Sequence, residues 1–407
     1  MDYDTLLSGC CEVARELLRH GAEIQRAEDT MRRLLAAYGL EGEVFAIPNC
    51  VWASAREPDG RVCTVMRRVP PSTLNIEGIE RFNDLSRRLC AAPPDDPGEL
   101  LLQCRREAAQ LRRYPMRLRV AGYFVGAFFF ALFFGGGLPE AGAAGLAGLA
   151  CGACLAYLEQ AGANAFLSTL ASAFVLGGSS CALLALGAPI SLEVTLAGGI
   201  MVLVPGLVFT NFMSNLLTGD MVSGLATCAR ALLSAAAIAL GAGAAMALFQ
   251  GLWPVQAGGS TTAYPPLVSC ALAYVACLGF CLPTNAQGVG AALCGLGGAL
   301  GWAVYLFLFG LGTNIFLANL LAAVAVSVWS EAMARRRRCP ATSYLVIGIF
   351  PLVPGLTIYQ AMDYGLRGHT ELFWDTFFRT FGIAGCLALG LLLVSASLEL
   401  QRRRLRG

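Results

Sequence analysis

The sequence predicts a polytopic α-helical membrane protein of about ten transmembrane helices, built as 5+5 inverted repeats with broken helices and preceded by a small cytoplasmic α+β domain. Three observations support this fold class. Charged residues make up 14% of the 407 residues, whereas soluble domains have about 25%. Most of the charges lie before residue 120, and the apolar remainder contains two Pro-Gly pairs in matching contexts.

The amino-terminal part, residues 1–117, has the composition of a soluble α+β domain. Residues 11–40 follow an amphipathic helical pattern that Gly21 either breaks or allows to pack closely. Two β-rich runs, 43–55 and 61–69, flank the turn sequence REPDG and predict a hairpin. A helix is expected over 76–90. The stretch 95–113 also has a helical pattern, and its helix is expected to begin near Pro97. Because no signal peptide precedes this domain, we expect it to stay in the cytoplasm.

The rest of the chain is apolar enough to lie in a bilayer. About 20 apolar residues suffice to cross the hydrocarbon core. Ten such stretches are found, five in a first membrane repeat over 118–250 and five in a second over 265–400. The expected spans lie near 118–137, 141–158, 163–186, 191–213, 219–249, 265–283, 286–309, 312–333, 341–362 and 373–399.

Arginine clusters provide an independent test of the span count, because basic residues favour cytoplasmic loops. With ten spans, three clusters and both termini fall on the cytoplasmic side. The loops assigned to the far side, near 135–140, 187–191, 250–264 and 363–371, contribute only Arg367. The three clusters are Arg112, Arg113, Arg117 and Arg119; Arg335 to Arg338; and Arg402, Arg403, Arg404 and Arg406.

The two membrane halves resemble each other in sequence. VPGL occurs at 204–207 and again at 353–356, and Arg230 and Arg379 share the same offset (379 − 230 = 149). Asn164 and Asn314 align at an offset of 150. An odd number of spans per copy inverts the second copy relative to the first. Many secondary transporters are built in this way, with the substrate site near mid-membrane.

Each Pro-Gly pair is expected to break a membrane helix, because Pro removes a backbone donor and Gly adds flexibility. Backbone groups freed in lipid must meet protein or water, so the breaks predict a polar cavity. A plain proline kink inside a packed helix is the alternative. The candidate substrate-binding residues are Pro205, Gly206, Asn211, Arg230, Asn164, Asn314, Pro354, Gly355, Gln360 and Arg379.

The charged candidates have structural alternatives. An intramembrane Arg costs about 2.5–3.5 kcal/mol unless it is paired or hydrated. Its guanidinium suits a carboxylate substrate, but an ion pair with Asp220 or Asp375 would also satisfy it. Asn164 and Asn314 open their spans and suit helix caps. Proton coupling requires a carboxylate that titrates in a cavity, and the candidates are Asp220 and Asp363, with a solvated loop position as the alternative for Asp220.

Several function classes lack support in the sequence. With two His, no His-based metal site is supported, and we expect neither a metal nor a cofactor. The sequence has no Walker A, G-x-S-x-G or H-E-x-x-H pattern, and no basic patch with interleaved aromatics suggests nucleic acid. The 16 Cys are scattered through apolar runs, which favours buried thiols in a reducing compartment.

The amino-terminal motif G-A-x-x-x-R-x-E-x-T-x-x-R is formed by Gly21, Ala22, Arg26, Glu28, Thr30 and Arg33. Together with the hairpin and the paired VPGL segments, it resembles the bacterial threonine/serine exporter (ThrE) family along essentially the whole chain. Ala27 stands where family members often have Val. The resemblance implies a multi-pass protein of the bacterial inner membrane that exports threonine, serine or small carboxylates using the proton motive force.

The leading hypothesis is therefore a secondary active exporter whose partners are an amino acid or carboxylate substrate and the bilayer; a homo-oligomer is left open. One alternative is a membrane-anchored hydrolase with its active site in residues 1–119. Its candidate groups are Glu23, Glu28, Cys50 and Cys63, although no nucleophile–base pair is evident. The other alternative is a passive small-solute channel, which cannot accumulate substrate against a gradient.

Overall fold

A computed structural model describes residues 2–57, 59–70, 73–203, 208, 212, 215, 219–252, 262–366 and 368–404. The chain forms two compact units. Unit 1 comprises Met1–Arg113 together with two short segments from later in the chain, Thr284–Gln287 and Ala334–Ser343. Unit 2 comprises Tyr114–Pro283, Gly288–Met333 and Tyr344–Gly407.

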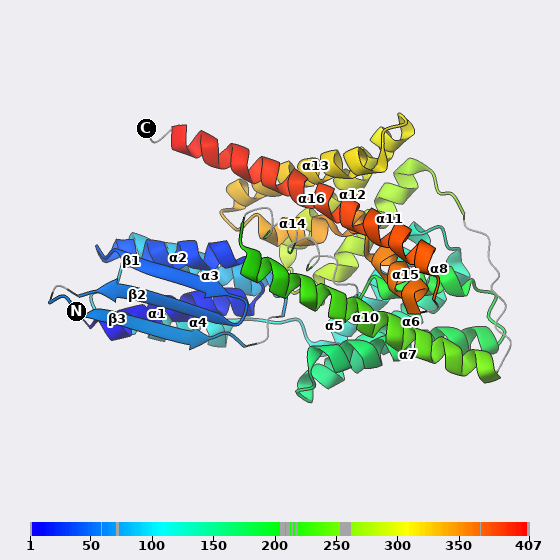
Figure 1. Ribbon diagram of the computed structural model, residues 1–407, viewed down its shortest axis with the longest axis horizontal. Coiled ribbons are helices and arrows are strands. Elements are labelled where there is room, and N and C mark those ends of the chain that lie inside the picture. The colour runs from blue at the N-terminus through cyan, green and yellow to red at the C-terminus, as the bar shows by residue number, and fades with distance from the viewer. Residues whose placement is uncertain are drawn as a thin grey trace. The chain divides into compact units, whose positions relative to one another are not determined.

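Unit 1 is an α+β structure with four helices and a three-stranded antiparallel sheet of order β1-β2-β3 (Figure 1). The helices α1 and α2 pack on the sheet, and α3 and α4 pack on α1. The amphipathic run is broken into two helices, with α1 ending at Arg19 and Gly21 at positive φ in the turn that follows, as one of the two sequence interpretations expects. The bounds are α1 Tyr3–Arg19, α2 Ile24–Ala37, β1 Gly42–Ile47, β2 Cys50–Arg56, β3 Val62–Arg68, α3 Ile76–Ala91 and α4 Gly98–Gln110.

The sheet of unit 1 differs in one respect from the sequence prediction. The hairpin across REPDG is confirmed, because β2 pairs with β3 in antiparallel register from Cys50↔Arg68 to Arg56↔Val62. However, the run 43–55 is not one strand but two, β1 and β2, which turn at Pro48 and Asn49. Pro and Asn are typical turn residues, and this turn was not predicted from the sequence.

The helix α3 shows how local sequence positions an element of unit 1. Asn75 caps it, with its Oδ1 accepting a hydrogen bond from the Gly78 N–H at 3.2 Å. Apolar side chains then recur every three or four residues and are buried in the core of unit 1. This buried face includes Ile79, Phe82, Leu85 and Leu89. The opposite face of α3 is left for other contacts.

Those contacts come from the two later segments of unit 1. The first two N–H groups of α3 donate to the loop between α11 (Pro266–Cys281) and α12 (Gly288–Gly310): Ile76 to the Thr284 carbonyl at 2.9 Å and Glu77 to the Asn285 carbonyl at 3.3 Å. At the other end of α3, the Arg87 guanidinium donates to the Arg338 carbonyl at 3.0 Å. Thus one helix of the amino-terminal domain binds both segments.

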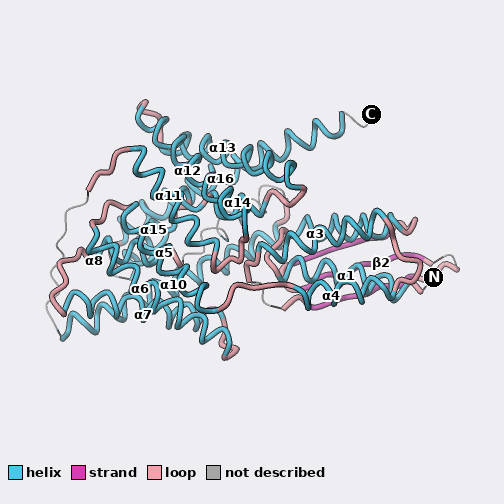
Figure 2. The backbone as a smooth tube through the Cα atoms, turned by 180° about the vertical axis from the view of Figure 1, so that it is seen from behind, coloured by secondary structure: helices cyan, strands magenta, loops and turns pink. Residues whose placement is uncertain are grey.

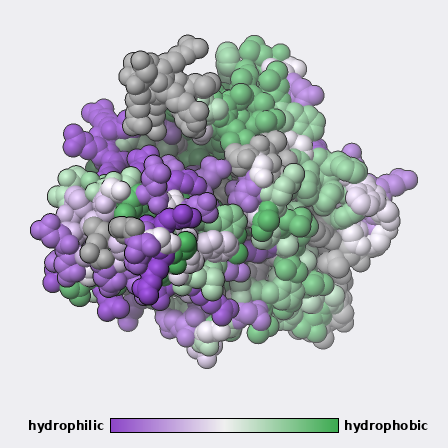
Figure 3. Space-filling model, turned by 60° about the vertical axis from the view of Figure 1, so that its left-hand side comes forward, coloured by the Kyte–Doolittle hydropathy of each residue, from purple (hydrophilic) through white to green (hydrophobic). Residues whose placement is uncertain are grey.

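Unit 2 is helical throughout its described residues, and strands are drawn only in unit 1 (Figure 2). Figure 3 shows apolar side chains gathered over its helices, whereas polar side chains gather over unit 1. The bounds are α5 Met116–Phe133, α6 Leu138–Gln160, α7 Ala165–Ala185, α8 Leu192–Ile200, α10 Met221–Leu252, α11 Pro266–Cys281, α12 Gly288–Gly310, α13 Ile315–Arg337, α14 Thr342–Gly348, the 3-10 turn η1 Phe350–Leu352, α15 Gly355–Leu366 and α16 Thr370–Arg404.

Seven helices of the described chain are long and apolar enough to cross a membrane: α5, α6, α7, α10, α12, α13 and α16. Two further apolar segments, Pro266–Cys281 and Thr342–Leu352, are shorter. The fourth and ninth expected spans are not single helices. In the fourth, α8 ends at Ile200; in the ninth, α14, η1 and α15 follow one another with Pro354 between the last two.

Candidate functional site

The element order of unit 2 repeats after about 150 residues. The helices α6 and α12 have 23 residues each, and their starts are 150 residues apart (288 − 138 = 150). The pairs α5 and α11, α7 and α13, and α8 and α14 begin at the same offset, and α10 and α16 begin at 149. Residues with positive φ recur as well: Gly135 with Asn285, Gly162 with Gly312, and Gly219 with Gly368. The weak sequence match therefore corresponds to a duplicated set of elements.

The equivalent helices α5 and α11 pack against each other in antiparallel directions. Near the start of α5, Gly122 lies against Leu282 and Pro283, just after the end of α11. Near the end of α5, Ala131 and Leu132 share a cluster with Leu272, in the first half of α11. Between them the backbones meet at glycines, since a Cβ on Gly279 would lie 2.5 Å from the Gly126 nitrogen.

The centre of this helix pair joins equivalent residues. Phe130 and Phe280 are 150 positions apart, and their rings meet edge to face at 5.6 Å between centroids. A contact between equivalent residues of this kind is the one expected near the axis if the two halves are related by a pseudo-two-fold rotation.

Residues at both interruptions of the helices pack against the Phe130–Phe280 contact. Met201 immediately follows α8 and is buried in one cluster with Phe130 and Phe280. Phe350, the first residue of η1, packs on the same cluster, with its ring 4.7 Å from that of Phe280. The side chains at this meeting point are aromatic or aliphatic. A polar cavity would therefore have to lie beside this cluster rather than within it.

The second break carries a polar network. The Thr357 hydroxyl, in the first turn of α15, donates to the Pro354 carbonyl at 2.9 Å. The Thr380 hydroxyl of α16 lies 2.9 Å from the Thr357 hydroxyl and 2.7 Å from the Thr376 carbonyl. These groups provide hydrogen bonds where the Pro-Gly pair interrupts the helix. Gly355 begins α15, and Gln360 is half-buried within it.

The first repeat carries buried hydroxyls that have no hydrogen-bond partner among the described residues. Thr195 in α8 and Ser172 in α7 are fully buried, and Ser168 in α7 is 3% exposed. The helices α7 and α8 pack on each other. Buried hydroxyls normally have hydrogen-bond partners, so these three groups stand out as polar atoms whose hydrogen-bonding capacity is unused. The equivalent positions in the second repeat are Ala318, Ala322 and Leu345, which are apolar.

Arg230 and Arg379 occupy equivalent, exposed positions on α10 and α16. No ion pair to either guanidinium is found among the described residues, and Asp375 is also exposed. The next residue is buried in both cases, Ala231 and Thr380. Both helices contribute to one cluster, which contains Ala231, Ala235 and Ala384 with Phe381 packed against it. The backbone of each arginine therefore lies next to the contact between the two halves.

Three of the sequence-predicted residues cap helices. Asn164 Oδ1 accepts a hydrogen bond from the Leu167 N–H at 2.8 Å, and Asn314 Oδ1 accepts one from the Phe316 N–H at 2.9 Å. Asp220 Oδ1 accepts one from the Ser223 N–H at 3.1 Å at the start of α10. Pro205, Gly206 and Asn211 lie outside the described residues, as does the side chain of Asp363, whose backbone belongs to α15.

The motif residues of the amino-terminal domain have structural contacts in unit 1. Gly21 has a φ of 89° between α1 and α2. Arg26 donates to Oδ1 of the Asn83 side chain at 3.4 Å, and Glu28 accepts a hydrogen bond from the Ala46 N–H at 3.0 Å, which ties α2 to β1. Arg33 forms an exposed ion pair with Asp29 at 3.6 Å. These contacts connect α2 to its neighbours.

The fold defines a polytopic helical membrane protein, duplicated internally, with a separate α+β unit. Two family models match the chain: one described as "Putative threonine/serine exporter" over residues 8–249, and one described as "Threonine/Serine exporter, ThrE" over residues 269–397. The chain belongs to the threonine/serine exporter family. The threonine/serine exporter of Corynebacterium glutamicum is 24% identical over 346 residues, which cover 81% of this chain and 70% of that protein. No solved structure matches the chain.

The sequence did not identify three groups of residues that the structure brings together. The hydroxyls of Ser168, Ser172 and Thr195 are inconspicuous among small residues, and no periodicity separates them from packing positions. Asn285 and Gln287 stand out only as amides in the short polar run PTNAQG. Glu140, which binds two backbone N–H groups, resembles any first-turn acidic residue.

Proposed function

We propose that this protein is a secondary active exporter of threonine, serine or small carboxylates, driven by the proton motive force. The observation that carries the proposal is the antiparallel packing of the equivalent helices α5 and α11 around the Phe130–Phe280 contact. Copies related in this way enter a membrane in opposite directions. Such inverted repeats support alternating access around a site between the halves.

A ten-span topology with both termini in the cytoplasm of a bacterium, and the protein in its inner membrane, belongs to this proposal. Seven helices, the shorter α11, and the two interrupted segments around α8 and α14–α15 make ten crossings. In that topology the loops 284–287 and 334–343 lie on the cytoplasmic side. Both belong to unit 1 together with the amino-terminal domain, which supports a common side for all three. The polar surface of the domain suits that compartment.

We place the substrate beside the aromatic cluster, between the two breaks. Arg230 and Arg379 would attract its carboxylate, because a guanidinium pairs with carboxylate in bidentate geometry. The buried hydroxyls of Ser172 and Thr195 would hydrogen-bond the hydroxyl of serine or threonine. The further members of this proposed site are Asn211, Gln360, Asn164, Asn314, Pro205, Gly206, Pro354 and Gly355, with Asp220 and Asp363 as the proton carriers.

Two considerations favour amino acids over other cargo. The family and the C. glutamicum relative are both described as threonine/serine exporters. A hydroxylated zwitterion also uses both the arginines and the hydroxyl groups, whereas succinate would use only the arginines. Small carboxylates therefore stand as a weaker extension of the proposal.

The decisive experiment is efflux of labelled serine, threonine or succinate from proteoliposomes under an imposed proton gradient. We expect gradient-dependent efflux of serine and threonine, abolished by a protonophore. Flux that only equilibrates the substrate would instead indicate a passive channel, and flux equal to that of empty vesicles would refute transport of these solutes.

A matched pair of hydroxyl variants tests the position of the site. Ser172→Ala should slow serine efflux, because its hydroxyl has no partner among the described residues. Ser180→Ala serves as the control, since Ser180 is equally buried on α7 but its hydroxyl already donates to the Leu176 carbonyl at 2.9 Å. Equal efflux by both variants would remove Ser172 from the site.

A further inference from the structure

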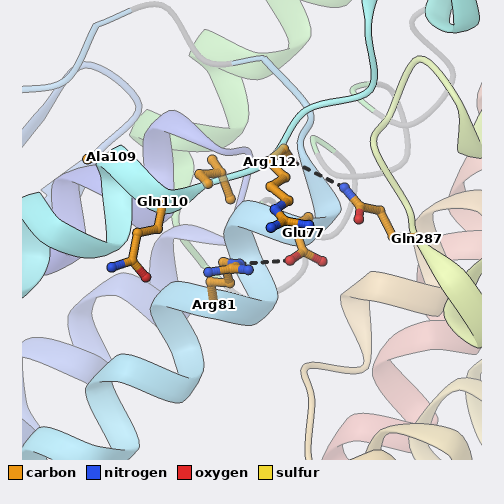
Figure 4. A pocket seen from close by; sticks show the side chains of 7 residues that line it. Glu77, Arg81, Ala109, Gln110, Arg112 and Gln287 are labelled. Carbon is orange, nitrogen blue, oxygen red and sulfur yellow. Dashed lines mark hydrogen bonds and ion pairs between the residues drawn. The ribbon is translucent and has the colours of Figure 1, made fainter.

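Unit 1 contains a polar pocket that is lined only by residues of this unit (Figure 4). Its volume is about 650 Å³, within the range of roughly 300–1,000 Å³ that is usual for small-molecule sites. Three segments line it: the first two turns of α3, the end of α4 with the residues after it, and the α11–α12 loop. The lining residues are Glu77, Arg81, Ala109, Gln110, Leu111, Arg112 and Gln287, all within unit 1.

The pocket combines both signs of charge with a small apolar surface. Arg81 pairs with Glu77 at 2.8 Å and lies 3.5 Å from Glu107. The Arg112 side chain is exposed, and no ion pair to its guanidinium is found in the described part of unit 1. Figure 4 shows Glu77, Arg81 and Arg112 gathered around the same opening. An unpaired guanidinium beside a carboxylate can bind a ligand that carries both charges.

The backbone of Arg112 is held in place while its side chain is available. Its carbonyl accepts hydrogen bonds from Asn285 Nδ2 at 3.0 Å and from Gln287 Nε2 at 3.1 Å. The amide of Gln287 also reaches Asn285 Oδ1 at 3.1 Å. Arg112 and Gln287 therefore line the pocket and also form the hydrogen bond that holds the α11–α12 loop. A ligand that contacts either residue would affect this hydrogen bond.

We propose that this pocket binds a free α-amino acid as its zwitterion, at a site separate from the transport site. The ligand carboxylate meets the guanidinium of Arg112, and its ammonium meets the Glu77 carboxylate. The amides of Gln110 and Gln287 provide further hydrogen bonds, and Ala109 and Leu111 accommodate a short side chain. The chemistry selects small zwitterions over pure anions or pure amines.

The position of the pocket gives the bound amino acid a regulatory role, and this part of the inference rests on the proposed function. Asn285 and Gln287 belong to the loop that leads directly into α12, an apolar membrane helix. Ligand bound between Gln287 and α3 would tighten that loop on the amino-terminal domain. An exporter would thereby respond to the cytoplasmic concentration of the amino acid that it removes.

The test is hydrogen exchange of the full chain in lipid nanodiscs, with and without L-serine. We expect serine to slow exchange in peptides covering 76–84 and 108–113, with saturation at one site. In Arg112→Gln and Glu77→Gln the concentration for half-maximal protection should rise about tenfold or more, because each variant removes one charged partner. Glycolate, which lacks the ammonium, and ethanolamine, which lacks the carboxylate, should give little protection.

The control variant is Arg106→Gln, because Arg106 is an exposed arginine of α4 outside the pocket lining. It should respond to serine like the parent chain. Absence of protection in the parent chain, or equal protection in Arg112→Gln and Arg106→Gln, would overturn the proposal. Efflux is measured separately. Protection by serine without efflux would support the amino acid site and refute the exporter function. Efflux without protection would support the exporter function and refute the amino acid site.

Discussion

Two equivalent loops of the duplicated unit have the same turn but different partners. The α5–α6 loop turns at Gly135, with a φ of 91°, and the α11–α12 loop turns at Asn285, with a φ of 57°. The first is closed within unit 2 by Glu140, whose carboxylate accepts hydrogen bonds from the Gly137 N–H at 2.9 Å and the Ser191 N–H at 3.1 Å. The second is closed by α3 of the amino-terminal domain.

The difference lies in which residues satisfy the hydrogen bonds of each loop. The position equivalent to Glu140 is Gly290, so the second loop lacks the carboxylate that closes the first. Its carbonyls instead accept the first N–H groups of α3, and Asn285 Nδ2 donates to Asn75 Oδ1 at 2.9 Å. The amino-terminal domain thus replaces an internal closure on one copy only. Inverted copies would present the two loops on opposite sides of the membrane.

The largest expected effect comes from Asn285→Asp. The residue is 4% exposed, and its amide faces the oxygen of Asn75 and the carbonyl of Arg112. A carboxylate of the same shape keeps the positive φ accessible but cannot donate, and each unsatisfied buried group costs about 1–3 kcal/mol. We expect a loss of about 3 kcal/mol in local stability, measured as exchange of the Ile76 and Glu77 amides about 100-fold faster.

The Gly137 and Ser191 amides are the internal control for this variant, because both donate to Glu140 at the other loop. Their exchange should stay within a factor of two of the parent rate, by the approximate additivity of distant sites. A uniform acceleration at both loops would mean that Asn285→Asp acts on global folding and that the two closures are not independent.

Acid should weaken the second loop and leave the first unchanged. The pKa of His20 is lowered to about 4. Burial is the main cause, and the nearby charges of Arg113 and Arg19 add to it, whereas the carboxylate of Glu16 raises the pKa and offsets part of the shift. His20 lies beneath the first turn of α3, and its carbonyl accepts a hydrogen bond from the Asn75 N–H at 3.1 Å. Because the folded pKa is depressed, the unfolded state binds the proton first, and stability falls as the pH drops from about 6.5 to about 4.

The expected loss from this histidine is on the order of 2–3 kcal/mol, since one pKa unit corresponds to about 1.4 kcal/mol. Fluorescence of Trp52 in β2, monitored during chemical unfolding across this pH range in a variant whose other four tryptophans are replaced by Phe, measures it. His20→Phe keeps a ring for stacking on Phe82 and should flatten the acid dependence. An unchanged slope in that variant would show that another group titrates.

A smaller effect is expected from Glu140→Gln at the first loop. The amide retains one acceptor oxygen but turns a donor toward the second N–H, and it removes the charge that strengthens both hydrogen bonds. We expect a loss of about 1–2 kcal/mol, observed as exchange of Gly137 and Ser191 roughly tenfold faster. The Ile76 and Glu77 amides should exchange at the parent rate, which is the opposite of the pattern expected for Asn285→Asp.

The smallest effect should come from Arg87→Ala, at the far end of α3. Its hydrogen bond to the Arg338 carbonyl is exposed, so water can replace it. We expect a change of no more than about 0.5–1 kcal/mol in the unfolding free energy of unit 1. A loss as large as that of Asn285→Asp would show that the last turn of α3, and not the first, makes its most stabilising contact with the later segments.

The helices and the internal duplication follow largely from local sequence. Apolar length predicts α6, α7 and α12 directly, and the second Pro-Gly pair predicts the interruption around Pro354. The first pair lies outside the described residues, so the break expected there stays a prediction. The turn at REPDG is also local, because its residues favour a reversal whatever they pack against. These features need no knowledge of distant partners.

The partners of the loops could not be predicted from the sequence. Asn285 and Asn75 are 210 residues apart, and nothing in either stretch specifies the other. The antiparallel contact of Phe130 with Phe280 follows only once the copies are placed together. The unpaired hydroxyls of Ser172 and Thr195 are visible only when the burial of α7 and α8 is known.

Labelling with a membrane-impermeant thiol reagent tests the inverted arrangement most directly. Leu138→Cys and Val289→Cys lie at exposed positions directly after the two equivalent loops. With the parent chain as the background, the account predicts that intact cells label Leu138→Cys, and that Val289→Cys labels only after the membrane is permeabilised. Labelling of both positions from the same side would contradict the inversion and the carrier mechanism built on it.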